Sequence, residues 1–123
     1  MGDAGVPSAS PAVARLLSEG ITGIQVMADW SADPVWCIGS PDQHGMLDLD
    51  DLDLSPTLVR ALRDWRAAWE AALSENDDFD WPSTVAERTW TAQGLVLARR
   101  LQQELGDQLQ VFYVHGGGRA QEP

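Results

Sequence analysis

The chain has 123 residues and a formal net charge of −11, and 44% of its residues are hydrophobic. That length fits one domain with a modest core, and the hydrophobic fraction, which includes six tryptophans, excludes a disordered chain. The negative charge argues against nucleic acids as partners, because proteins that bind phosphates need a basic face, and it favours a basic protein partner.

Targeting signals are not evident in the sequence. Residues 1–20 lack the charged start and apolar run of a secretory signal, and no stretch approaches the roughly 20 apolar residues of a membrane span. The single cysteine, Cys37, cannot form an internal disulfide. We therefore expect a cytoplasmic protein that binds no membrane.

Composition divides the chain into three parts. Residues 1–20 are rich in Gly, Ala, Ser and Pro, which predicts a flexible N-terminal extension. Residues 21–115 hold the periodic segments and predict a single domain. Residues 116–123 predict a flexible tail.

Alternation of hydrophobic and polar residues predicts the strands. The segment ITGIQVMADW, residues 21–30, alternates in this way and predicts a first strand that ends near Asp29. Residues 35–38 lie between two proline turns and predict a short second strand. Residues 108–114, QLQVFYV, predict a last strand that pairs with the first.

Two helices are predicted between these strands. Ser55 followed by Pro56 marks a helix start, because Ser caps free N–H groups and Pro fits the first helical position, and this helix should extend to about residue 75. Its apolar stripe consists of Leu58, Leu62, Trp65, Trp69 and Leu73. Thr84 and Glu87 match a capping box for a second helix, and Gly106 suits its end. The prediction is an α+β fold in which an antiparallel helical hairpin packs on one face of a small two- or three-stranded sheet.

The segment GMLDLDDLDLSP, residues 45–56, alternates aspartate with leucine. A calcium-binding EF-hand loop that starts at Asp48 needs an oxygen ligand at position five, glycine at six and glutamate at twelve. The sequence has Leu52, Asp53 and Val59 there, which argues against calcium. Two interpretations remain: the leucines hold the segment on the core while the aspartates face water, or the aspartates also bind a basic partner. These aspartates are Asp48, Asp50, Asp51 and Asp53.

A second acidic group, Asp77, Asp78 and Asp80, follows the first helix together with Phe79. A helix of about 20 residues is roughly 30 Å long, so the two groups should lie near opposite ends and should not share a metal. We expect them to border one extended electronegative surface, in which Phe79 and Trp81 are candidate apolar anchors for a partner. The alternative for Trp81 is a hydrophobic contact that closes the helix pair.

A pocket behind the first strand is the alternative site. The residues that would form it are Asp29, Trp30, Trp36, Cys37, His44 and His115. Tryptophans can line a ligand pocket, and a cysteine with a histidine can act as a nucleophile. However, Cys37 lies in an apolar run that favours a buried, unreactive thiol, and neither C-x-x-C nor H-x-x-x-H spacing is present. The sequence therefore predicts no metal, no cofactor and no catalytic residue.

Four short motifs together resemble a known group of sequences. They are the strand VMADW, the turn DPVW, the helix entry DLDLSPTL and the LRDW of the first helix. The chain resembles short, acidic, uncharacterised proteins of high-GC bacteria that share a VMAD-aromatic strand, a Pro-x-Trp turn and an L-x-L-S helix start. The resemblance covers about residues 24–114 and implies the same domain limits, but no catalytic residues.

The sequence predicts a non-enzymatic, acidic interaction protein that binds a basic protein partner in the manner of an immunity protein or antitoxin. The alternative is a small enzyme or small-molecule binder that uses the pocket near Asp29, Cys37, His44 and His115. A purely structural subunit is a third interpretation. The sequence leaves the oligomeric state open.

Overall fold

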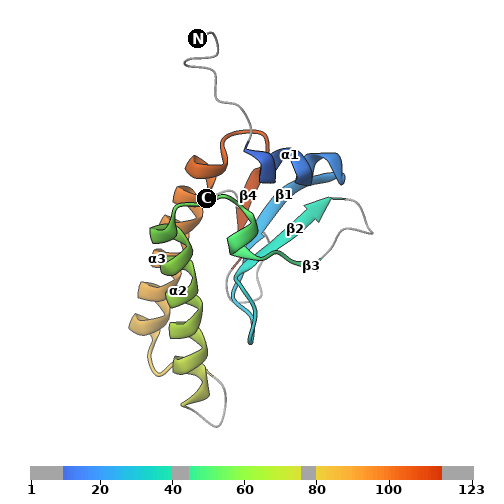
Figure 1. Ribbon diagram of the computed structural model, residues 1–123. Helices are drawn as coiled ribbons and strands as arrows, with labels where there is room; N and C mark the ends of the chain where they lie inside the picture. The colour runs from blue at the N-terminus through green and yellow to red at the C-terminus, as the bar shows by residue number, and fades with distance from the viewer. Residues whose placement is uncertain (1–9, 40–44, 76–79, 115–123) are drawn as a thin grey trace.

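The computed structural model describes residues 10–39, 45–75 and 80–114, and Figure 1 shows a helical hairpin beside a sheet. The elements in chain order are α1 (Pro11–Ser18), β1 (Ile21–Val26), β2 (Val35–Gly39), β3 (Gly45–Met46), the 3₁₀ turn η1 (Leu49–Asp51), α2 (Pro56–Ser74), α3 (Thr84–Leu105) and β4 (Gln110–Tyr113). The predicted α+β class is confirmed. No helix in the described part of the chain is long and apolar enough to cross a bilayer.

The sheet has four strands in the order β3-β2-β1-β4, which corrects the predicted two or three. The strand that prediction missed is β3, because two residues are too few to show alternation. β1 pairs antiparallel with β2 and parallel with β4, so the predicted pairing of the last strand with the first is confirmed. The hairpin of α2 and α3 carries the chain back so that β4 can run parallel to β1.

The ends of α2 and α3 follow the local chemistry of their caps. The backbone N–H of Leu58 donates to Ser55 Oγ at 3.3 Å, as the Ser-Pro start predicts. In α3 the N-cap is Ser83, whose Oγ accepts from Ala86 N at 3.0 Å. The predicted cap at Thr84 is therefore wrong by one residue. Gly106 ends α3 with a φ of 85°, which glycine adopts readily, as predicted.

The helix α1 packs next to β1 and belongs to the core. Ala12, Val13 and Leu16 share one helix face and are at most 3% exposed. The predicted flexible extension is thus wrong for residues 10–20, because these three side chains bury enough apolar surface to hold the helix. Residues 1–9 and the predicted tail at 116–123 lie outside the described residues.

Two tryptophans join α2 to α3. The rings of Trp65 and Trp90 stack with centroids 4.2 Å apart and planes 4° apart. Each indole N–H donates to the other residue's backbone carbonyl, at 3.0 Å from Trp65 and 2.8 Å from Trp90. Gly94 leaves room for the Trp65 ring and for Tyr113, whose hydroxyl donates to Thr91 O at 2.8 Å. This cluster fixes the hairpin on β4.

A replacement of Gly94 tests this packing, because the packing decides whether the replacement lowers or raises the free energy of unfolding. An alanine Cβ would lie 2.5 Å from Trp65 Cζ2. Alanine in a helix interior is ordinarily more stable than glycine by about 1 kcal/mol, whereas overpacking a core costs about 1–3 kcal/mol. We expect Gly94→Ala to lower the free energy of unfolding, measured by urea denaturation. Gln93→Ala, at an exposed position of the same helix, is the control and should leave stability unchanged or raised. A stabilised Gly94→Ala variant would contradict the packing.

Candidate functional site

The acidic segment, residues 48–53, connects β3 to α2 and holds its aspartates outward. Leu49 and Leu52 are 0% and 1% exposed, so they attach the segment to the core as one interpretation predicts. Asp48 caps η1, because its Oδ1 accepts from Asp50 N at 2.8 Å. The side chains of Asp48, Asp50, Asp51 and Asp53 are all exposed. The segment therefore combines a buried leucine side with a carboxylate side that faces solvent.

The segment is also tied to α1. Asp53 has a φ of 57°, a left-handed conformation that aspartate tolerates better than most residues. Its Oδ2 accepts from Ala12 N at 3.1 Å, and Arg15 Nη2 donates to Asp51 O at 3.4 Å. The helix that composition assigned to a flexible extension thus positions two residues of the predicted partner site.

Arg63 on α2 organises the carboxylates. Its Nε and Nη2 donate to the two oxygens of Asp33, each at 3.0 Å, in a bidentate pair. The same guanidinium lies 3.4 Å from Asp48 Oδ1 and 3.3 Å from Asp50 Oδ1. Asp33 Oδ2 also accepts from Leu49 N at 3.1 Å. One arginine therefore links the β1–β2 loop, η1 and α2.

The ion pair shifts the pKa values of both partners. The hydrogen bond from Arg63, aided by one from Leu49 N, lowers the pKa of Asp33 below its ordinary value despite partial burial. Hydrogen bonds to Asp33 and Asp50 raise the pKa of Arg63. Sequence reasoning missed this pair, although one signal was present. Arg63 has no acidic residue three or four positions away on its own helix, whereas Arg60 and Arg66 each have one.

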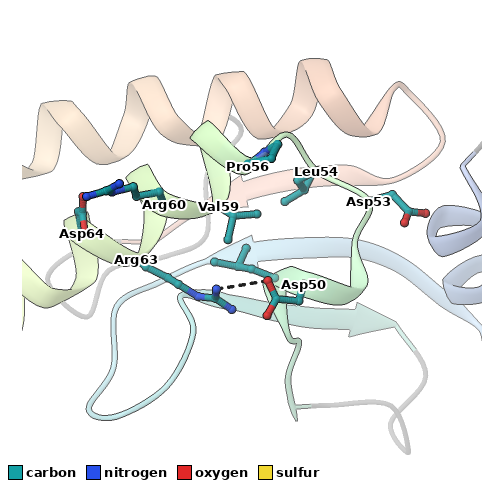
Figure 2. A pocket seen from close by; sticks show the side chains of 9 residues that line it. Asp50, Asp53, Leu54, Pro56, Val59, Arg60, Arg63 and Asp64 are labelled. Atoms are coloured by element: carbon teal, nitrogen blue, oxygen red, sulfur yellow. Dashed lines mark hydrogen bonds and ion pairs between the residues drawn. The ribbon is translucent and has the colours of Figure 1, made fainter.

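A groove of about 640 Å³ lies between the acidic segment and the first turns of α2 (Figure 2). It has an apolar base and a charged rim. Its lining residues are Leu49, Asp50, Asp53, Leu54, Pro56, Val59, Arg60, Arg63 and Asp64. The sequence suggested an acidic surface, but the rim of this groove also contains Arg60 and Arg63. Arg60 pairs with Asp64 at 3.9 Å.

Asp80 is the one member of the second predicted acidic group that the structure describes, and it lies just before α3. Asp77, Asp78 and Phe79 lie outside the described residues. Asp80 is exposed, and its Oδ1 accepts from Trp81 N at 2.7 Å. The 19 residues of α2, a length of roughly 28 Å, lie between the acidic segment and Asp80. Trp81 packs against Trp90 with centroids 5.2 Å apart, as the helix-closing interpretation predicts.

Among the described residues of the alternative pocket, Asp29 does not share a hollow with Trp36 and Cys37. Asp29 lies just beyond the end of β1 beside Trp69 and Trp81, and Trp30, 42% exposed, packs on Trp69 with centroids 4.8 Å apart. Trp36 and Cys37 instead line a separate hollow on the sheet, together with Phe112. His44 and His115 lie outside the described residues. In the described ranges no three His, Cys, Asp or Glu residues are placed to hold a metal.

The thiol of Cys37 gives a direct test of the enzyme alternative. Cys37 is only 9% exposed, within the core cluster. We expect slow reaction of the native protein with a thiol reagent near neutral pH and fast reaction after unfolding in urea, because burial shields the sulfur from the reagent. A native rate equal to that of the unfolded chain would instead support a functional thiol.

The Asp33–Arg63 pair predicts a pH-dependent contribution to stability. A carboxyl with a lowered pKa in the folded state stabilises the fold above its ordinary pKa of 3.8, and this contribution is lost as the pH falls through the lower folded value. We expect Asp33→Asn to lower the free energy of unfolding at pH 7 by about 1–2 kcal/mol, with the difference from wild type closing in acid. Denaturation curves across pH measure this. Asp107→Asn, in the exposed turn after α3, is the control, and a gap that stays constant into acid would disprove the role of the pair.

Comparison with known proteins gives one family. No curated protein matches the sequence significantly. The sequence model of a family described as Serratia CdiI immunity protein-like matches residues 22–116. The match begins in β1 and extends past β4, so it includes the acidic segment and the hairpin and leaves α1 outside. Because it spans well over half of the 123 residues, the chain belongs to the Serratia CdiI immunity protein-like family.

Proposed function

We propose that this protein is an immunity protein, which binds a toxin protein and neutralises it without catalysis. Membership of the Serratia CdiI immunity protein-like family carries the proposal. Under this proposal the protein acts in the cytoplasm, needs no cofactor, and uses the acidic segment and the adjoining groove as its contact surface. The partner presents a basic face to this surface.

Charge favours this surface for a basic partner. The chain carries a net charge of −11, and the segment exposes four carboxylates within six residues. Complementary charge of this kind speeds encounter between proteins more than it holds the complex together. The affinity then requires desolvated apolar contacts, and the apolar base formed by Leu49, Leu54 and Val59 offers room for one side chain of the partner.

Carboxylate side chains of this surface are already held in place in the free protein, which also favours it as a docking surface. Arg63 holds the carboxylates of Asp48 and Asp50, and the backbone N–H of Ala12 in α1 holds that of Asp53. Side chains that are already placed lose less conformational entropy on binding, typically about 0.5–1.5 kcal/mol each. The ordered carboxylates support a docking surface that needs little rearrangement.

Capture and protection test the proposal. The intact protein, immobilised and incubated with lysate, should retain one protein that elutes in a narrow window of a salt gradient. Expression of that protein alone should arrest growth, and co-expression with this chain should restore it. Growth arrest that co-expression does not relieve would disprove the immunity role.

Charge-neutral variants test the surface. Asp50→Asn with Asp51→Asn removes two exposed charges, and we expect the association rate at low salt to fall about tenfold, because electrostatic steering acts over distance. Glu75→Gln with Asp107→Asn removes the same charge at other exposed positions and is the matched control. Stopped-flow measurements over a range of salt concentrations give the rates. Equal effects of the two pairs would show that only net charge matters and would reject this surface.

A further inference from the structure

A second hollow, separate from the groove, lies at the opposite end of the hairpin. Its volume is about 530 Å³, and it is bordered by the end of β1, the last turns of α2 and the first turns of α3. The lining residues are Met27, Ala28, Asp29, Trp69, Leu73, Asp80, Trp81, Glu87, Trp90, Thr91 and Val114. Three tryptophans and three carboxylates thus meet in one hollow.

The indole rings are held in place by the core. Trp90 is 6% exposed and stacks on Trp65, so its position is fixed by the hydrogen-bonded pair that joins the helices. Trp81 packs on Trp90 with planes 44° apart, and Trp69 packs on Trp30 with planes 52° apart. Trp69 and Trp81 are only partly buried. Parts of their rings therefore face solvent in a preformed arrangement.

Negative charge surrounds these rings. Asp29, Asp80 and Glu87 line the hollow, and none of its described lining residues is basic. Asp29 Oδ1 accepts from Trp30 N at 2.7 Å, and Asp80 Oδ1 accepts from Trp81 N at 2.7 Å, so each carboxylate is oriented. A carboxylate has about four acceptor positions, which leaves capacity for further donors.

Arg66 lies close to the hollow, and its ion pair is with Glu70 rather than with a residue that lines the hollow. Its Nη1 donates to the backbone carbonyl of Asp29 at 3.3 Å and pairs with Glu70 at 3.1 Å. The side chain of Arg66 is 17% exposed, so the arginine is largely enclosed beside Glu70. Its charge is matched by Glu70.

We propose that this hollow binds one arginine side chain of the toxin, with the guanidinium against the tryptophan faces and its N–H groups donating to the carboxylates. The identity of the source rests on the proposed function. Indole faces attract cations through their quadrupole, and the planar guanidinium stacks on aromatic rings better than an ammonium does. The rings and the carboxylates both favour a guanidinium cation, whereas a purely apolar pocket would not.

A matched pair of small probes tests the site without the toxin. N-acetyl-arginine methylamide and its citrulline analogue differ mainly in charge, because a urea replaces the guanidinium. In ¹H–¹⁵N spectra we expect saturable shifts of the indole N–H signals of Trp69 and Trp81, with the arginine probe binding about fivefold more tightly or better. Equal binding of both probes, or no shift with either, would overturn the proposal.

Charge-neutral variants test whether the arginine probe binds in this hollow. Asp80→Asn with Glu87→Gln should weaken the arginine probe by about fivefold, because two of the three carboxylates are removed. Both side chains are exposed, so the fold should be retained. Glu19→Gln with Asp107→Asn is the control of equal charge at exposed positions that line neither the hollow nor the groove. Equal weakening by both pairs would show a general effect of charge and would reject the hollow as a site.

The captured toxin decides the source of the arginine. Asp80→Asn with Glu87→Gln should weaken toxin binding about tenfold, and the loss should add to that of the Asp50 and Asp51 variant, since distant sites act independently. If only the Asp50 and Asp51 variant weakens the complex, the hollow is not a toxin contact, although the proposed function stands. If no toxin is captured, the proposed function fails, whereas the probes still decide whether the hollow accepts a guanidinium.

Discussion

The two hydrogen bonds exchanged by Trp65 and Trp90 set the spacing of α2 and α3, and other features of the structure follow from that spacing. A buried indole N–H without a partner costs about 1–3 kcal/mol, and here each ring satisfies the other's requirement while stacking on it. The close approach leaves no room for a side chain at Gly94 and brings Tyr113 of β4 against the helices. Both proposed contact surfaces are carried by this one hairpin.

Charge within the domain is arranged by very few cations. Arg63 faces Asp33, Asp48 and Asp50 together, and each of these carboxylates comes from a segment outside α2. Without a central cation, carboxylates this close would repel one another and spread the acidic segment. With it, the segment keeps a defined shape while most of its charge still faces solvent. At the other end Arg66 pairs with Glu70, and Asp29, Asp80 and Glu87 line the aromatic hollow.

Sequence patterns predicted the parts of this fold that are local. The apolar stripe and the Ser55-Pro56 start gave α2 nearly to its last residue, and the alternation in residues 108–114 gave β4. Composition misled for α1, because Gly, Ala, Ser and Pro outweighed the three apolar residues that hold it. Arg63 pairs with Asp33, 30 residues away in sequence, and Asp29 lines the aromatic hollow with Trp69 and Trp81, which lie still farther along the chain. No periodicity within one segment contains that information, so the predicted pocket grouped Asp29 with Trp36, whereas the structure places Asp29 beside Trp69 and Trp81.

The parallel pairing of β1 with β4 has a consequence for how the chain reaches this structure. Gly23 pairs with Gln110, so one edge of the first strand is completed by almost the last described part of the chain. Contacts so distant in sequence must close a large loop before they gain any stability, and they slow folding. During synthesis that edge of β1 stays unpaired until the ribosome has made both long helices and β4. The docking of β4, rather than the early helix α1, therefore completes the pairing of β1.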